Sequence, residues 1–222
     1  MDEKLRQLKK DILVSSFNAG ACHIGSALSC IDILYDIFYR LIEKDDIFIF
    51  GKASGVSALY VILADKGYFP KEKLADYLKK YPLASKEVNG VIHSVGSCGH
   101  GLNVAAGIAL GKKMKQENGK VYCLIGDGEC QEGSVYEAIL FARHHNLDNL
   151  HLYVDNNGLQ ALGKTSEIIG LHSAFTFMKN ALPNVKIIKT IKGQGVSFLE
   201  NKIESHYMNL TKELLNKALC EI

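Results

Sequence analysis

Residues 121–158 decide the fold, and they read VYCLIGDGECQEGSVYEAILFARHHNLDNLHLYVDNNG. The apolar run at 121–125 is typical of a buried strand, residues 133–146 have the spacing of a helix, and LHLYVD at 150–155 is a second strand. A strand, a helix and a strand in this order predict a βαβ unit and hence a parallel sheet. The loops after the two strands then emerge at the same carboxyl edge, where α/β proteins bind ligands.

Polar loops follow both of these strands. GDG occupies 126–128 and NNG follows the second strand, so Asp127 and Asn157 can converge above the sheet edge. Their oxygens suit Mg²⁺ or Ca²⁺, which also accept diphosphate oxygens. Each motif alone is an ordinary turn, because Gly, Asp and Asn dominate turns. GDGECQEG has its third glycine displaced from the dinucleotide-binding GxGxxG pattern, and the sequence has no GxxxxGK[ST] P-loop.

The rest of the chain alternates predicted helices and short strands. We expect helices at 2–18, at 30–43 with Ser29 as the cap, at 54–67, 71–81, 102–116 and from about 210, and strands at 47–50 and 185–191. Between 82 and 101 a Gly-rich loop leads into a helix N-terminus, where free N–H groups favour an anion. No repeat or linker divides the sequence. We therefore expect one α/β domain over residues 1–222, with a parallel sheet flanked by helices.

The composition is that of a globular protein with a small or medium-sized ligand. The 222 residues are 47% hydrophobic and 23% charged, and the formal net charge is +2. So small a charge gives no argument for a nucleic-acid surface. The N-terminal segment is amphipathic and charged, unlike a signal peptide, and no apolar run reaches the about 20 residues that a membrane helix needs. We expect a cytoplasmic protein whose partners include neither nucleic acid nor a membrane.

Five segments together resemble the transketolase family. ACHIGSALSCIDIL is similar to the family's first cofactor loop and GSCGHGLNVAAGIALG to its second, GDGECQEGSVYEA and VDNNGLQALGKT resemble its metal-binding segments, and KGQGVSFLEN resembles its last strand and turn. The matches extend from about residue 4 to about residue 210. The resemblance implies the thiamine-diphosphate-binding fold, with thiamine diphosphate held through Mg²⁺ or Ca²⁺.

The resemblance also implies which residues hold the cofactor. The metal ligands would be Asp127, Asn157 and the backbone carbonyl of Leu159. Three glycines would line the diphosphate, namely Gly99, Gly126 and Gly128.

Three histidines and two glutamates receive roles from the same resemblance. His23 and His100 would face the cofactor and the reacting end of the substrate, and His206 would approach the diphosphate or the donor. Glu132 and Glu137 would lie at the cofactor-binding interface that links two active sites through acidic residues and water. An isolated histidine is more often structural than catalytic, but His23 and His100 both lie in Gly-rich loops beside the cofactor segments.

The sequence departs from the family on the side of the donor. The family has Lys-Gly-His-Ala after its short strand, whereas this chain has KASG at 52–55, so Ser54 replaces the histidine. A hydroxyl cannot do acid–base work near neutral pH without help. Ser85 lies near the place of a second expected histidine, and the region 170–190 is shorter than in the family. These changes keep the cofactor segments and favour an unusual sugar substrate.

The resemblance further implies a partner. In the family, the glutamate that activates the thiamine aminopyrimidine comes from a second domain, for which 222 residues leave no room. We expect a separate C-terminal subunit that supplies this pyrimidine-binding domain and the activating glutamate, in an α2β2 assembly. The implied reaction is transfer of a ketol (two-carbon) unit from a ketose-type donor to an aldehyde acceptor, with sugar or sugar-phosphate substrates.

Three alternatives to this reaction stay open. The first is pyruvate decarboxylation with acetyl transfer to a sugar carbonyl. The second is a catalytically degenerate cofactor-binding subunit, which the two missing histidines would explain. The third is a nucleotide-binding dehydrogenase domain, which would bind NADH without a metal.

Overall fold

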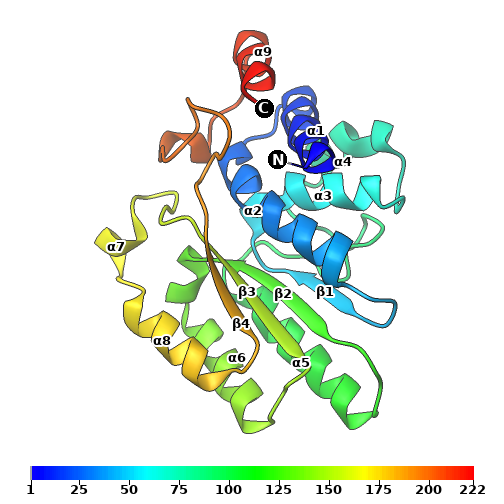
Figure 1. The fold of residues 1–222 in the computed structure, drawn as a ribbon, viewed down its shortest axis with the longest axis vertical. Helices are drawn as coiled ribbons and strands as arrows, with labels where there is room; N and C mark the ends of the chain where they lie inside the picture. The colour runs from blue at the N-terminus through cyan, green and yellow to red at the C-terminus, as the bar shows by residue number, and fades with distance from the viewer. Residues whose placement is uncertain (1) are drawn as a thin grey trace.

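A computed structural model describes residues 2–222, which are built around a parallel sheet of four strands (Figure 1). The strands lie in sequence order and are β1 (Ile47–Phe50), β2 (Val121–Gly126), β3 (Leu150–Asn156) and β4 (Val185–Lys189). The register places Phe50 beside Leu124 and Gly126 beside Asp155, so the carboxyl ends of neighbouring strands open at one edge. The predicted α/β fold with a parallel sheet flanked by helices is confirmed.

Helices cover both faces of this sheet (Figure 1). One face carries α5 (His100–Met114), α6 (Gly133–His144) and α8 (His172–Ala181). The other carries α1 (Glu3–Ala19), α2 (Ile24–Asp36) and α3 (Val56–Asp65), with α4 (Leu74–Lys80) and α9 (Lys212–Glu221) packed against α1. A single helical turn, α7 (Thr165–Ile168), lies in the connection after β3.

The burial of strand β2 explains why residues 121–125 form one apolar run in the sequence. All six of its residues are buried, as expected for a parallel strand that is covered on both faces. Val121, Cys123 and Ile125 belong to the core beneath α5, α6 and α8, whereas Tyr122 and Leu124 belong to the core beneath α1, α2 and α3. The sheet thus separates two hydrophobic cores.

Helix α5 approaches β1 so closely that only glycine fits at the contact. A Cβ atom on Gly101 would lie 2.5 Å from the Cα atom of Gly51, well inside van der Waals contact. A side chain at Gly101 would push the helix away from the strand, and one at Gly51 would collide with Ile125 of β2 at 2.8 Å. The two glycines therefore place the N-terminus of α5 at the carboxyl edge of the sheet.

The start of the second helix differs from the sequence prediction. The pattern predicts a helix from residue 30 capped by Ser29, but α2 begins at Ile24. Ser29 lies inside the helix, where its hydroxyl donates to the Asp155 carboxylate at 2.6 Å and lies 3.0 Å from the Ser26 carbonyl oxygen. The prediction is wrong because the first two turns consist mostly of small residues, which show no spaced apolar face although they are buried.

Two further differences concern helix α5 and helix α8. The sequence predicts α5 from residue 102, and the helix begins two residues earlier, at His100. It predicts no helix within the region 170–190, yet α8 forms there before β4. Ser, Phe and Thr are weak helix formers, so α8 owes its helical state to packing of Ala174 and Met178 against the sheet.

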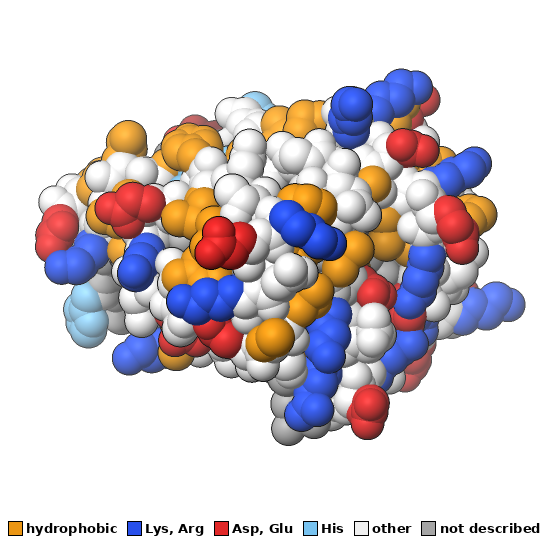
Figure 2. Space-filling model, turned by 90° about the horizontal axis from the view of Figure 1, so that it is seen from above, with side chains coloured by type: hydrophobic (Ala, Val, Ile, Leu, Met, Phe, Trp, Pro, Cys, Tyr) orange, Lys and Arg blue, Asp and Glu red, His pale blue; other side chains and the backbone are white. Residues whose placement is uncertain are grey.

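The surface carries mixed charge. On the face shown in Figure 2, lysine and arginine side chains alternate with aspartate and glutamate, in keeping with the net charge of +2. Within residues 2–222, no helix combines the length and the apolar character needed to cross a lipid bilayer.

Candidate functional site

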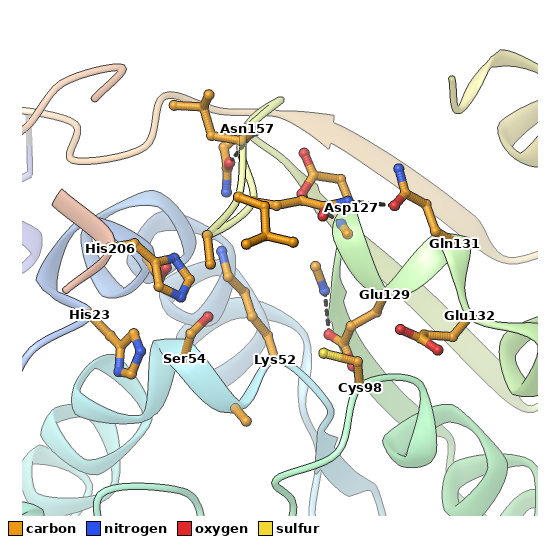
Figure 3. Close-up of a pocket in the computed structure, with 18 of the residues that line it drawn as sticks. His23, Lys52, Ser54, Cys98, Asp127, Glu129, Gln131, Glu132, Asn157 and His206 are labelled. Carbon is orange, nitrogen blue, oxygen red and sulfur yellow. Dashed lines mark hydrogen bonds between the residues drawn. The ribbon is translucent and has the colours of Figure 1, made fainter. Parts of the chain in front are cut away.

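A cavity of about 410 Å³ opens at the carboxyl edge of the sheet (Figure 3). Its walls come from the loops that follow β1, β2 and β3, from the start of α2, and from the segments before α5 and α9. The residues that the cavity shares with the sequence predictions are His23, Ser54, Gly126, Asp127, Gly128, Glu132, Asn157, Leu159 and His206. Segments far apart in the sequence therefore meet where the parallel topology predicts a ligand site.

Asp127 is one of two buried carboxylates that line this cavity. It follows β2 directly and is 3% exposed. One of its oxygens accepts a hydrogen bond from the Gly128 N–H at 2.8 Å, and the other accepts one from the Gly158 N–H at 2.6 Å. Burial raises the pKa of Asp127, although Lys52 and these N–H groups act in the opposite direction. A divalent cation at this carboxylate would offset the cost of burying its charge.

Asn157 lies in the turn after β3, close to Asp127 (Figure 3), and Leu159 of the same turn also lines the cavity. The Asn157 side-chain oxygen accepts from the Leu159 N–H at 3.0 Å, and its amide nitrogen lies 3.4 Å from the Ser29 hydroxyl. Residues 2–222 contain no group of three or more His, Cys, Asp and Glu side chains suited to a metal. One carboxylate, one amide and one carbonyl could instead provide a hard oxygen set, to which a ligand would have to add its own oxygens.

Glu129 joins the two glycine-rich loops. Its carboxylate is buried and accepts hydrogen bonds from the Gly99 N–H at 3.1 Å and from the Gly126 N–H at 2.7 Å. Burial raises the pKa of Glu129, and the two N–H groups and Lys52 oppose that shift. Sequence reasoning missed this residue, although a carboxylate between two glycine motifs is a recognisable partner for their free N–H groups.

A third buried charged side chain, Lys52, also lines the cavity (Figure 3). Its ammonium forms an ion pair with Asp155, which is fully buried, and donates to the Ser29 hydroxyl at 3.0 Å. Thr190 donates to the other oxygen of Asp155. Burial tends to lower the pKa of Lys52, but the Asp155 carboxylate outweighs it and the pKa is raised. No sequence pattern indicates this pair, because 103 residues separate its members.

His23 and His206 lie side by side on the cavity wall, near Ser54 and Lys52 (Figure 3). Their ring centroids are 4.8 Å apart, and the His23 backbone N–H donates to the His206 carbonyl at 3.0 Å. Burial, with the nearby charge of Lys192, lowers the pKa of His23 and lowers that of His206 to about 3. Both rings are therefore neutral at physiological pH.

The remaining predicted residues lie around the cavity or away from it. Gly99 precedes α5 with a φ of 82°, and its neighbour Cys98 lines the cavity. His100 begins α5 with an exposed side chain, and Glu137 is exposed on α6. Neither of these two residues lines the cavity. Glu132 is exposed and lines the cavity.

Known proteins match this chain over nearly its whole length. The family model "Thiamine pyrophosphate enzyme, C-terminal TPP binding domain" matches residues 74–221. A protein of Phocaeicola vulgatus that is named as one subunit of apulose-4-phosphate transketolase is 32% identical over 256 aligned residues, which cover 96% of this chain and 90% of the relative. The 6-deoxy-6-sulfo-D-fructose transketolase subunit SqwG of a Clostridium species is 33% identical, with 91% and 89% covered.

A solved transketolase has the same fold. The enzyme of Campylobacter jejuni superposes with a TM-score of 0.85 at 26% identity, covering 98% of this chain and 42% of its own. The chain thus spans less than half the length of that transketolase, but nearly the full length of relatives named as subunits. From its matched model, its relatives and its fold, the chain belongs to the transketolase family of thiamine pyrophosphate enzymes.

Proposed function

We propose that the whole chain, residues 1–222, is the diphosphate-binding domain and subunit of a two-chain transketolase. The observation that carries this proposal is the pairing of Asp127 with the Asn157–Leu159 turn at the mouth of one cavity. These residues would hold Mg²⁺ or Ca²⁺, and the metal would bind the diphosphate of thiamine diphosphate. Family membership supports the same cofactor.

The chain's own residues would orient the cofactor and balance its charge. Gly126 and Gly128 line the cavity without side chains, which would let a diphosphate approach their backbone, and a Cβ on Gly128 would lie 3.1 Å from Gln160. Lys52 would add positive charge below it, and His23 would face the reacting end of the substrate. Thiamine diphosphate itself supplies the electron sink that two-carbon transfer between a ketose and an aldehyde requires.

Catalysis would need a second subunit. Two relatives are named as transketolase subunits, which supports a partner for this chain. Two large, mainly apolar side chains that line the cavity are also exposed to solvent: Leu162 is 87% exposed and Tyr207 is 66% exposed. A C-terminal subunit that brings the pyrimidine-binding domain and the activating glutamate would cover them, in an α2β2 assembly. The cytoplasmic location stays a prediction.

The substrate would be a non-standard sugar or sugar phosphate. Two relatives are named for apulose 4-phosphate and for 6-deoxy-6-sulfo-D-fructose, and this chain matches both over nearly their full length. Ser54 lines the cavity where the family has a histidine, so donor contacts differ there. Ser85, near the place of the second expected histidine, does not line this cavity.

Reconstitution with the partner subunit tests this function. We expect the two chains together, with thiamine diphosphate and Mg²⁺, to transfer a two-carbon unit from a ketose to an aldehyde, and each chain alone to be inactive. Xylulose 5-phosphate should be a poor donor relative to a branched or C6-modified ketose. Release of CO₂ from pyruvate would instead support acetyl transfer. Tight cofactor binding with no turnover of any donor would identify a degenerate subunit.

A further inference from the structure

Lys192 carries a buried ammonium that the proposed function does not yet use. It follows β4 in the KGQG turn and is 1% exposed. Its side chain passes Gly25 at the start of α2, where a Cβ would lie 3.4 Å from Lys192 Cγ. No carboxylate of residues 2–222 lies within ion-pair distance of this ammonium. An isolated buried cation is costly, so its position calls for an explanation.

Two acceptors contact the ammonium. Lys192 Nζ lies 3.0 Å from Nδ1 of His206 and 3.3 Å from the backbone carbonyl oxygen of Gln160. Gln160 directly follows Leu159, whose backbone carbonyl is one of the proposed metal ligands. The lysine thus connects the turn that would hold the metal to His206, which lines the same cavity.

The chemistry of the two groups fixes the direction of the Lys192–His206 hydrogen bond. A lysine ammonium has three N–H donors and no acceptor, so Nδ1 of His206 must be the acceptor. A neutral imidazole with an unprotonated Nδ1 carries its proton on Nε2. Burial and the charge of Lys52 lower the pKa of Lys192 to about 8, so the ammonium form still prevails at neutral pH.

We propose that Lys192 is a positioning residue that holds His206 in a single tautomer, with Nε2–H as a hydrogen-bond donor for the ligand in the cavity. This inference rests on the proposed function, because the acceptor would be an oxygen of the diphosphate or of the sugar donor. His206 then acts as a fixed donor and not as a proton shuttle. The other titratable groups around His206 are His23, Tyr207 and Lys52.

Nitrogen NMR of the full chain labelled with ¹⁵N-histidine tests the tautomer without any cofactor. The His206 signals are identified by their loss in His206→Gln. In the wild type we expect a pyridine-like Nδ1, a pyrrole-like Nε2, and a ring that stays neutral as the pH falls to about 5, below the ordinary histidine pKa of about 6.5. A proton on Nδ1, or exchange between tautomers, would overturn the proposal.

Lys192→Met removes the donor but keeps most of the side-chain volume. We expect its His206 ring to exchange between tautomers and to take a second proton at a higher pH than in the wild type. Unchanged His206 signals in a folded Lys192→Met would overturn the proposal. Lys189→Met, at an exposed lysine three residues earlier, is the matched control and should leave His206 unchanged. If Lys192→Met does not fold, the wild-type spectrum alone decides.

The affinity for thiamine diphosphate separates this inference from the proposed function. Loss of a residue that orients a ligand-binding group typically lowers the affinity for the ligand by about 10-fold to 100-fold. Lys192→Met should therefore bind the cofactor at least about 10-fold more weakly than the wild type. Lys189→Met should bind as the wild type does. If the wild type binds no cofactor yet shows the single tautomer, the proposed function fails while the Lys192–His206 arrangement stands. Equal cofactor affinity in the wild type and Lys192→Met would contradict the proposed role in binding.

Discussion

Asp127→Ala is expected to weaken binding of thiamine diphosphate in the presence of Mg²⁺ by at least about 100-fold. Loss of a residue that only orients a metal ligand lowers affinity by about 10-fold to 100-fold, and loss of a ligand itself should cost more. Asp127 is the only carboxylate among the proposed ligands Asp127, Asn157 and Leu159, so its removal leaves the cation with uncharged donors. It also accepts the Gly158 N–H, and its loss frees the turn that carries the other two ligands. Calorimetric titration of the cofactor at fixed Mg²⁺ measures the effect.

Asp148→Ala is the matched control for this variant. Asp148 is an exposed carboxylate at the opposite edge of the sheet, before β3. Its removal should leave cofactor affinity unchanged, and circular dichroism should show that both variants are folded. An Asp127→Ala protein that binds the cofactor within a few-fold of the wild type would remove Asp127 from the metal site.

Asp155→Ala should produce the largest loss of stability, about 3–5 kcal/mol in the free energy of unfolding. Asp155 is fully buried, and its removal leaves the buried ammonium of Lys52 without a counter-charge. The hydroxyls of Ser29 and Thr190 lose their acceptor as well. Urea denaturation at neutral pH measures the change, with the slope of the transition checked against that of the wild type.

An exposed ion pair provides the comparison for this variant. Lys164 and Glu167 approach to 2.9 Å, but both side chains are more than half exposed. Glu167→Ala should therefore change stability by no more than about 1 kcal/mol, since water screens such pairs. A similar small loss in Asp155→Ala would show that Lys52 and Asp155 do not form the buried pair described above.

The fold could be predicted because its signals are local. The apolar run of β2, the helix after it and the run of β3 fix a parallel βαβ unit through side-chain spacing alone. Helix α2 could not be placed correctly, because its first turns are small residues whose helical state depends on burial against α3 and the sheet. Helix α8 has weak propensity and likewise depends on its packing.

The candidate site divides in the same way. Asp127 and Asn157 could be predicted because each follows a strand and the topology brings the strand ends together. Lys52 and Lys192 could not, because their partners are distant in the sequence, and the pattern around Glu129 does not show that its carboxylate is buried. A lysine or glutamate in a loop is usually solvated, and only the three-dimensional structure shows that these are buried.

Calorimetric titration of thiamine diphosphate into the wild-type chain, with Mg²⁺ and then with a chelator, tests the central claim most directly. The proposed site predicts binding that requires the divalent cation, because the ligand oxygens complete its coordination, and that becomes tighter when the partner subunit is added. Binding of equal strength in the chelator, or no binding with Mg²⁺ and the partner both present, would contradict the claim that this cavity holds the diphosphate.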